Sequence, residues 1–119
     1  MDLELYPKSG VPIIEGYGTG YVTISGKKVT DTLILYPDKF EEIEPGDISS
    51  IIKSINLYKN KLDLIIYGSL IEIENKNDII KKLNINSLPI EFMQTSAACR
   101  TWTVLIGEGR AIGAIIETS

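Results

Sequence analysis

Short apolar runs separated by turn signals divide the chain into strands and helices of ordinary length. Residues 12–25 and 28–36 are rich in β-branched and aromatic side chains and flank the turn sequence Ser-Gly-Lys-Lys, which predicts a β-hairpin. The polar segment 37–46 is typical of a loop, and we expect its acidic run Glu-Glu-Ile-Glu to be solvated. The first third of the chain is therefore predicted to be a hairpin followed by a loop.

Two short helices and two strands are predicted between residues 47 and 93. Asp47 is a typical N-cap, and Asn77 or Asp78 begins a second helix. Residues 61–68 form a nearly continuous apolar run, as expected for a strand buried on both faces, and 88–93 form another short strand. Strand, helix and strand in succession predict a right-handed parallel crossover. The core-facing helical positions are Ile48, Ile51, Ile52, Ile55, Ile79, Ile80 and Leu83.

The segment 95–114 differs in composition from the rest of the chain. It contains every alanine, both arginines, the only cysteine and the only tryptophan of the chain. The run Thr-Trp-Thr-Val-Leu-Ile is compatible with a strand, but an apolar stripe at helical spacing favours a helix over 96–106, capped by Thr95 and ended by Gly107 and Gly109. That stripe consists of Ala98, Trp102, Leu105 and Ile106. A last strand would follow in Arg-Ala-Ile-Gly-Ala-Ile-Ile.

Composition limits the chemistry that the protein can perform. The 119 residues predict one domain, and a net charge of −4 argues against nucleic-acid binding. The absence of histidine excludes His-based triads, Cys–His dyads and His-ligated metal sites, and the single cysteine excludes a CxxC motif. We therefore expect no metal or cofactor, and the balance is against an enzyme. The acidic N-terminus and the lack of an apolar run of about 20 residues predict a cytoplasmic protein without membrane insertion.

Two motifs are better explained structurally than chemically. The glycines of Gly-Tyr-Gly-Thr-Gly-Tyr at 16–21 superficially resemble a phosphate-binding loop, which requires a strand before the glycines and a helix after them. Here they lie within β-rich sequence, and we interpret them as a bulge or tight bend in the hairpin. Cys99 lies past the first turn of the predicted helix and has no histidine base, which favours a buried structural cysteine.

The segment 91–110 resembles the C-terminal signature of the domain of unknown function 498 family. The family pattern is roughly E-x-M-x-T-x-x-A-x-R-T-[YF]-N-x-L-x-x-E-x-R. Trp102 stands where Tyr or Phe is usual, and Thr103 replaces the usual Asn, an amide that could have belonged to a polar site. The matching positions are Glu91, Met93, Thr95, Ala98, Arg100, Thr101, Leu105, Glu108 and Arg110.

The resemblance implies both a fold and a function. It implies a compact α/β domain, with a mixed central sheet that carries helices on one side and an extended N-terminal β-hairpin on the other. It also favours the helix for 96–106. The family includes a mitochondrial assembly factor for respiratory complex I, so the resemblance implies an accessory protein that binds a protein partner and suggests a membrane respiratory subunit as that partner.

A second hypothesis is a small-molecule or anion site, or a weak enzyme. Ligands of open α/β sheets collect at the carboxyl ends of parallel strands. Those ends bring Gly68 and Ser69 near Thr95 and Ser96, with Arg100 one helical turn further on. We expect these five residues to form an anion or partner site.

Structural ion pairs are the alternative explanation for the two arginines. Glu91 and Glu108 flank Arg100 and Arg110 in sequence, and a guanidinium can bridge a carboxylate with two parallel hydrogen bonds. Glu91, Glu108 and Arg110 are therefore predicted to form ion pairs that fix the last helix against the strand before it.

Overall fold

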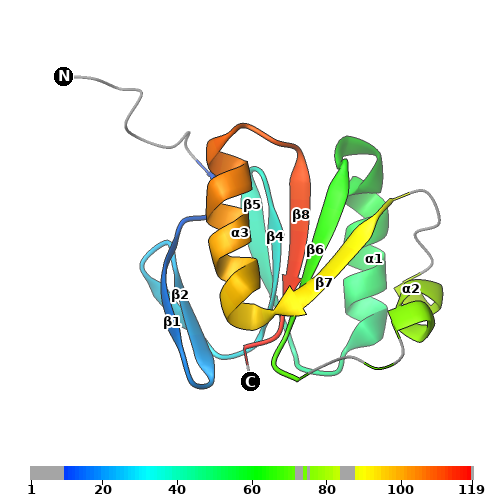
Figure 1. The fold of residues 1–119 in the computed structure, drawn as a ribbon, viewed down its shortest axis with the longest axis horizontal. Coiled ribbons are helices and arrows are strands. Elements are labelled where there is room, and N and C mark those ends of the chain that lie inside the picture. The colour runs from blue at the N-terminus through cyan, green and yellow to red at the C-terminus, as the bar shows by residue number, and fades with distance from the viewer. Residues whose placement is uncertain (1–9, 72–73, 75, 84–87, 119) are drawn as a thin grey trace.

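The fold is built around a five-stranded mixed sheet in the order β5-β4-β8-β6-β7 (Figure 1). The computed structural model describes residues 10–71, 74, 76–83 and 88–118. The strands are β1 (Ile14–Gly18), β2 (Tyr21–Ile24), β3 (Lys27–Val29), β4 (Thr32–Tyr36), β5 (Lys39–Ile43), β6 (Leu64–Ser69), β7 (Ile90–Gln94) and β8 (Ile112–Ile116). The helices are α1 (Ile48–Tyr58), the 3₁₀ turn η2 (Lys59–Lys61), α2 (Lys76–Leu83) and α3 (Thr95–Gly107).

Strand β6 lies between two parallel neighbours, β7 and β8, while β4 pairs antiparallel with both β5 and β8. The predicted parallel connection between 61–68 and 88–93 is thus confirmed. Ile65 and Ile66 of β6 are fully buried and belong to different core clusters, one on each face of the sheet. A strand buried on both faces needs the continuous apolar run seen in the sequence.

The predicted turn at Ser-Gly-Lys-Lys is confirmed, because β2 and β3 pair antiparallel across it, but the segments on either side of the turn are divided into shorter strands than predicted. Residues 12–25 fold back on themselves as β1 and β2, and 28–36 are divided between β3 and β4, which belong to separate sheets. The chain reverses before β2 and before β3 at two tight turns, at which Gly20 and Gly26 have φ values of 82° and 84°, a region that glycine adopts without steric penalty. A register shift between Ile14 and Gly16 confirms that the glycine-rich motif accommodates a bulge and a bend.

The predicted loop 37–46 is wrong over half of its length. Lys39–Ile43 form β5, an edge strand paired with β4 from Tyr36↔Lys39 to Thr32↔Ile43. The acidic run is therefore partly held on a sheet rather than free in solvent. Phe40 packs against one core cluster, and Ser54 of α1 donates a hydrogen bond to Glu41. Such a half-polar edge strand has no continuous apolar run by which the sequence could identify it.

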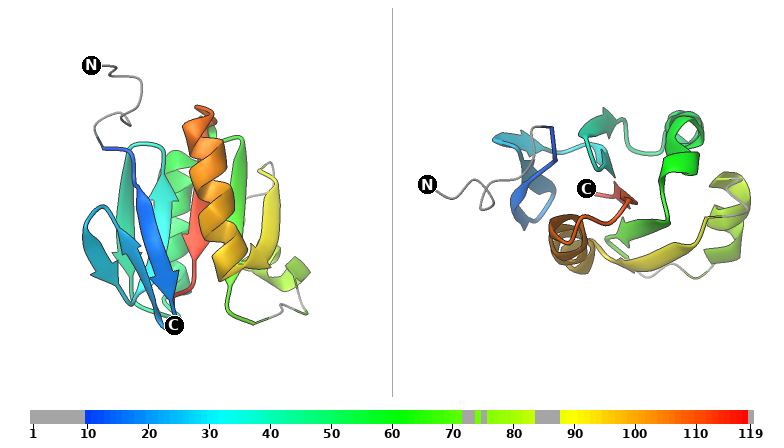
Figure 2. Two further views of the ribbon diagram at one scale, coloured as in Figure 1. Left: turned by 60° about the vertical axis from the view of Figure 1, so that its left-hand side comes forward. Right: turned by 90° about the horizontal axis from the view of Figure 1, so that it is seen from above.

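The helices lie on both faces of the central sheet. Ile51 and Ile55 of α1 and Leu83 of α2 pack on one face, as expected on the side away from the hairpin. Helix α3 lies on the other face, beside the three-stranded sheet β1-β2-β3 (Figure 2). The α/β class, the mixed sheet and the separate N-terminal β-structure are thus as predicted, but α3 packs on the hairpin side of the sheet and not on the side of α1 and α2.

Helix α3 is placed by small and large residues together. A Cβ added at Gly68 would lie 2.6 Å from the Cβ of Ala98, so the helix approaches β6 as closely as two small residues allow. Trp102 is fully buried, and its Nε1 donates to the carbonyl of Pro12 at 3.2 Å. The tryptophan therefore fills the space between α3, the central sheet and the N-terminal sheet, which explains why α3 shares the hairpin's side.

The predicted N-caps have different outcomes. Asp47 caps α1 as expected, since its Oδ1 accepts from the backbone N–H of Ser50 at 3.1 Å. Hydrogen bonds from the Ser50 hydroxyl and backbone lower the pKa of Asp47. Thr95 does not cap α3, because its hydroxyl donates to the carbonyl of Glu117 at 2.7 Å. The hydroxyl thus joins the start of α3 to the C-terminal segment.

Candidate functional site

The carboxyl ends of β6 and β7 are closed by the protein's own C-terminal segment. The Glu117 carboxylate accepts from the Tyr67 hydroxyl at 2.9 Å and from the backbone N–H of Leu70 at 3.3 Å. Burial and the neighbouring Glu117 carboxylate raise the pKa of Tyr67. A carboxylate of the chain itself therefore lies beside the strand end at which the sequence suggested an external anion.

The five residues expected to form an anion site are not all brought together. Gly68, Ser69 and Thr95 meet at the strand ends, but Gly68 serves helix packing, and Ser69 donates to the carbonyl of Ile71 at 2.7 Å. Ser96 is half-buried in the first turn of α3. Arg100 is exposed and directed toward β1, where its Nη1 donates to the Tyr17 hydroxyl at 2.8 Å. The two hydroxyls at the strand ends are thus used within the chain.

The expected ion pairs of the two arginines do not form among the described residues. The two ion pairs of this part of the chain are Lys27–Glu42 and Lys39–Glu41, both of which involve β5. Glu91 is exposed on β7, and Glu108 is exposed at the end of α3. Arg110 is also exposed, in the turn before β8, which leaves its guanidinium available for other contacts.

Cys99 is a buried structural cysteine, as predicted. Its side chain belongs to the core cluster on the α3 face of the sheet. Burial raises the pKa of the thiol to about 11, and the nearby Arg100 charge only partly offsets this effect. Because the thiolate is the reactive form, the side chain is inert near neutral pH.

A groove of about 360 Å³ lies at the opposite end of the central sheet, the upper end in Figure 1. Three segments far apart in sequence build it: the β4–β5 turn, the end of α1 with η2, and the turn after α3. Its lining residues are Tyr36, Pro37, Asp38, Tyr58, Lys61, Leu62, Gly109, Arg110 and Ala111. The groove combines two tyrosines and apolar side chains with the cations of Lys61 and Arg110.

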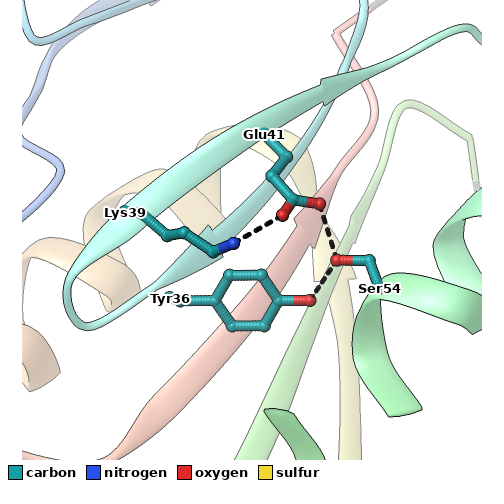
Figure 3. Close-up of polar contacts among 4 residues, drawn as sticks. All are labelled: Tyr36, Lys39, Glu41 and Ser54. Atoms are coloured by element: carbon teal, nitrogen blue, oxygen red, sulfur yellow. Dashed lines mark hydrogen bonds and ion pairs between the residues drawn. The ribbon is translucent and has the colours of Figure 1, made fainter. Parts of the chain in front are cut away.

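A chain of hydrogen bonds beside the groove fixes one of its walls (Figure 3). The Tyr36 hydroxyl lies 2.5 Å from Ser54 Oγ, and Ser54 in turn donates to Glu41 Oε1 at 2.7 Å. Lys39 Nζ donates to the other oxygen of Glu41 at 2.8 Å. Because Ser54 uses its proton toward Glu41, Tyr36 is the donor in the first of these bonds.

In this chain of hydrogen bonds, Tyr36 is neutral, Glu41 is ionised and Lys39 is protonated near neutral pH. Burial, partly offset by the Ser54 hydrogen bond, raises the pKa of Tyr36 to about 12, so its phenol stays neutral. Burial opposes ionisation of Glu41, but hydrogen bonds from Lys39 and Ser54 outweigh it and lower the pKa of that carboxyl. The Glu41 and Tyr58 contacts raise the pKa of Lys39. The ammonium also lies 4.3 Å from the centroid of the Tyr58 ring and 5.8 Å from that of Tyr36, so it makes cation–π contacts with both tyrosines.

Few features of the sequence indicate this groove. The sequence predicts Arg110 only as part of an ion pair, and Lys61 and Tyr58 belong to no motif. The one usable signal is that Tyr36-Pro37-Asp38 and Gly109-Arg110 are turn sequences that combine exposed charges with an aromatic side chain. Which turns lie next to each other depends on the strand order, and the sequence left that order open.

The fold defines an α/β domain in which a mixed sheet separates α1 and α2 from α3 and a small N-terminal sheet. A family model described as "Protein of unknown function (DUF498/DUF598)" matches residues 14–117. The chain therefore belongs to the DUF498 family, as the signature in residues 91–110 indicated. None of the curated proteins matches the chain.

Solved structures from several bacteria share the fold. A Mth938-like domain protein from Bordetella pertussis has a TM-score of 0.72 and 18% identity, over 99% of this chain and 92% of its own. A structure described as an outer membrane protein from Bartonella henselae has a TM-score of 0.70 and 21% identity, over 93% and 96%. The Rpa2829 protein from Rhodopseudomonas palustris has a TM-score of 0.65 and 24% identity, over 93% and 84%. At these identities, the similarity shows the fold alone. Within the described residues, no helix is long and apolar enough to cross a membrane.

Proposed function

We propose that this protein is a non-catalytic accessory domain that binds a protein partner through the surface where α3 meets β1. This surface, the α3–β1 seam, is defined by Ile13, Tyr17, Arg100 and Val104. More specifically, we propose the assembly-factor role that the family resemblance implies. Its partner would be a subunit of a membrane-bound respiratory complex.

The geometry of Arg100 carries the proposal. Its guanidinium donates to the Tyr17 hydroxyl and has no carboxylate partner within the described residues. An arginine presents five N–H donors in a rigid fork, so a neutral hydroxyl leaves most of this capacity unused. Since Tyr17 already fixes the side chain, a carboxylate of a partner would bind it with little further loss of side-chain entropy.

The surroundings of Arg100 fit a protein interface. Val104, one turn further along the same face of α3, is 58% exposed, and Ile13, just before β1, is 44% exposed. Tyr17 is 40% exposed although its hydroxyl is bonded. Arginine and tyrosine next to apolar side chains are typical of the few residues that dominate binding energy at protein interfaces.

Co-purification from the native host tests the proposal. We would express tagged wild type, Arg100→Ala and Tyr17→Phe, crosslink, solubilise the membranes and identify the proteins that are enriched. Lys53→Ala, an exposed charge on α1 at the other face of the sheet, is the matched control. We expect one set of partner proteins with wild type and Lys53→Ala, its loss with Arg100→Ala, and partial loss with Tyr17→Phe, which keeps the ring but removes the hydroxyl.

Two outcomes would contradict this function. If no protein is enriched with the wild type over an untagged strain, the domain is not a stable partner-binding protein. If the same proteins are recovered equally with Arg100→Ala, binding uses another surface. The identity of the partners separates the general proposal from its specific form, because enrichment of respiratory subunits is required only by the assembly-factor role.

A further inference from the structure

The groove at the upper end of the sheet has a chemistry that the proposed partner surface does not use. Arg100 lies on α3 beside β1, whereas the groove is lined by the turn after α3 and by the segments on the opposite face of the sheet. The two surfaces therefore require separate explanations, and the groove can be tested without knowing any protein partner.

The groove has an excess of available positive charge. Lys61 and Arg110 line it, and neither forms an ion pair within the described residues. The one acidic residue among the lining side chains is Asp38, whereas the Lys39 ammonium next to the groove is already neutralised by Glu41. One carboxylate against two cations leaves a net positive charge at the rim, in a protein whose overall charge is −4.

The interior of the groove is aromatic and held in place. The rings of Tyr36 and Tyr58 contact each other with centroids 4.4 Å apart and planes tilted by 38°. Tyr36 is fixed by the hydrogen bond to Ser54, and Leu62 beside them is buried. Because the Tyr36 phenol is neutral, this wall does not repel an anion. Tyr36 itself is buried, so the half-buried Tyr58 ring offers the aromatic surface, and a planar apolar group could pack against this ring without reorganising the wall.

We propose that the groove binds a small organic anion, a planar apolar body that carries one carboxylate or phosphate group. The oxyanion lies between Arg110 and Lys61, where the guanidinium can donate two parallel hydrogen bonds, and the planar body packs toward Tyr58 and Leu62. A volume of about 360 Å³ is at the lower end of the range for small-ligand sites, which sets the ligand's size.

A titration followed by backbone amide shifts in NMR spectra tests this site with defined probes. The probes are 4-hydroxybenzoate and phenyl phosphate as aromatic anions, inorganic phosphate as the anion alone, and phenol as the neutral ring. We expect the two aromatic anions to shift the amides of Lys61, Leu62, Arg110 and Ala111, with a Kd on the order of 1 mM for ligands of about ten non-hydrogen atoms. Inorganic phosphate should bind more weakly at the same residues, and phenol should bind least.

Matched variants place the binding at the proposed cations. Arg110→Gln and Lys61→Gln each remove one charged donor and should weaken binding of phenyl phosphate by about tenfold, as expected for a charge-assisted hydrogen bond. Lys53→Gln removes an exposed charge on α1 that does not line the groove and should leave the affinity unchanged. All three side chains are exposed, so the variants should keep the wild-type spectrum outside their own neighbourhood.

The comparison of probes also shows whether the ligand's negative charge is that of a carboxylate or of a phosphate ester. A preference for 4-hydroxybenzoate supports a carboxylate ligand, and a preference for phenyl phosphate supports a phosphate ester. The site is overturned if no anion shifts the groove amides at about 10 mM, roughly ten times the expected Kd. Equal binding by Arg110→Gln and wild type would also overturn it, as would equal binding of phenol and the anions.

Discussion

At the carboxyl ends of β6 and β7, the hydroxyls of Tyr67, Ser69 and Thr95 all bond within the chain, and the Glu117 carboxylate supplies the negative charge. At the other end of the sheet, Lys61 and Arg110 face a groove without carboxylate partners among the described residues. A strand end that resembles a ligand site in sequence can thus be closed by another segment of the same chain, here the residues after β8. Turn residues without any motif can form the open site.

The largest effect is expected at Gly68, in the closed end. Gly68→Ala would place a Cβ 2.6 Å from that of Ala98, and such overpacking typically costs about 1–3 kcal/mol of unfolding free energy. Chemical denaturation measures the change. In the double variant with Ala98→Gly, we expect part of the loss to be recovered, and strictly additive effects would show that the two residues do not limit the approach of α3.

Ser54 is expected to have the next largest effect, because it joins Tyr36 to Glu41. Ser54→Ala leaves the buried Tyr36 hydroxyl without its partner and removes one of the two hydrogen bonds to the half-buried Glu41, so it should lower the unfolding free energy by about 1–3 kcal/mol. Ser49→Ala, on the exposed side of α1, is the control for loss of a serine hydroxyl. Equal stability of the two variants in urea denaturation would mean that the bonds beside the groove do not stabilise the fold.

Acid should weaken the same group of residues. The pKa of Glu41 is lower in the folded protein than its ordinary value near 4.5, so its contribution is present above that value and is lost as the pH falls through the folded-state pKa. Wild type should therefore lose stability below about pH 4.5, and Glu41→Gln should show a flatter acid limb. Thermal unfolding between pH 3 and 7 measures both, and parallel curves would assign the acid sensitivity to other carboxylates.

Alkaline pH should affect both ends of the sheet through Tyr36 and Tyr67. Burial raises the pKa of each phenol in the folded state, so the stabilisation is present below the ordinary value of 10.0 and is lost as the pH rises above it. We expect Tyr67→Phe, which also loses the Glu117 hydrogen bond, to lower stability by about 1 kcal/mol at neutral pH. Its alkaline loss should be smaller than that of wild type, and an unchanged slope above pH 10 would contradict this explanation.

The smallest effect on stability is expected at Arg110, in the open end. Arg110→Gln should change the unfolding free energy by less than about 0.5 kcal/mol, as is usual for an exposed side chain without structural partners. A larger loss in urea denaturation would restore the ion-pair interpretation from the sequence. Glu108→Gln is the informative control, because a genuine pair would make the two variants equally destabilised.

Much of the fold could be predicted because local sequence patterns identify individual strands and helices. The buried run before Gly68 identified β6, and the spacing of Ala98 and Trp102 identified α3, with the family signature as a second support. Strand β5 was missed because Glu41 and Glu42 make half of it polar. Whether a segment is an edge strand or a loop depends on the partner strand, and the local composition does not contain that information.

The candidate site was less predictable than the fold, because the folded backbone determines which side chains come close together. Arg100 and Thr95 are close in sequence, yet α3 directs them to different neighbours, Tyr17 and Glu117. Arg110 and Lys61 are far apart in sequence and line the same groove. An arginine with a glutamate two residues away suggests an ion pair, but only the path of the backbone determines whether the two charges meet.

The most direct test of whether the groove binds an anion is a titration of wild-type protein with phenyl phosphate, in which amide shifts are followed at both ends of the sheet. We predict saturable shifts at Lys61, Leu62, Arg110 and Ala111, with Gly68, Ser69 and Thr95 unmoved. Shifts at the carboxyl ends of β6 and β7 without shifts at the groove residues would contradict this prediction. The anion would then bind at the end of the sheet that the chain itself closes.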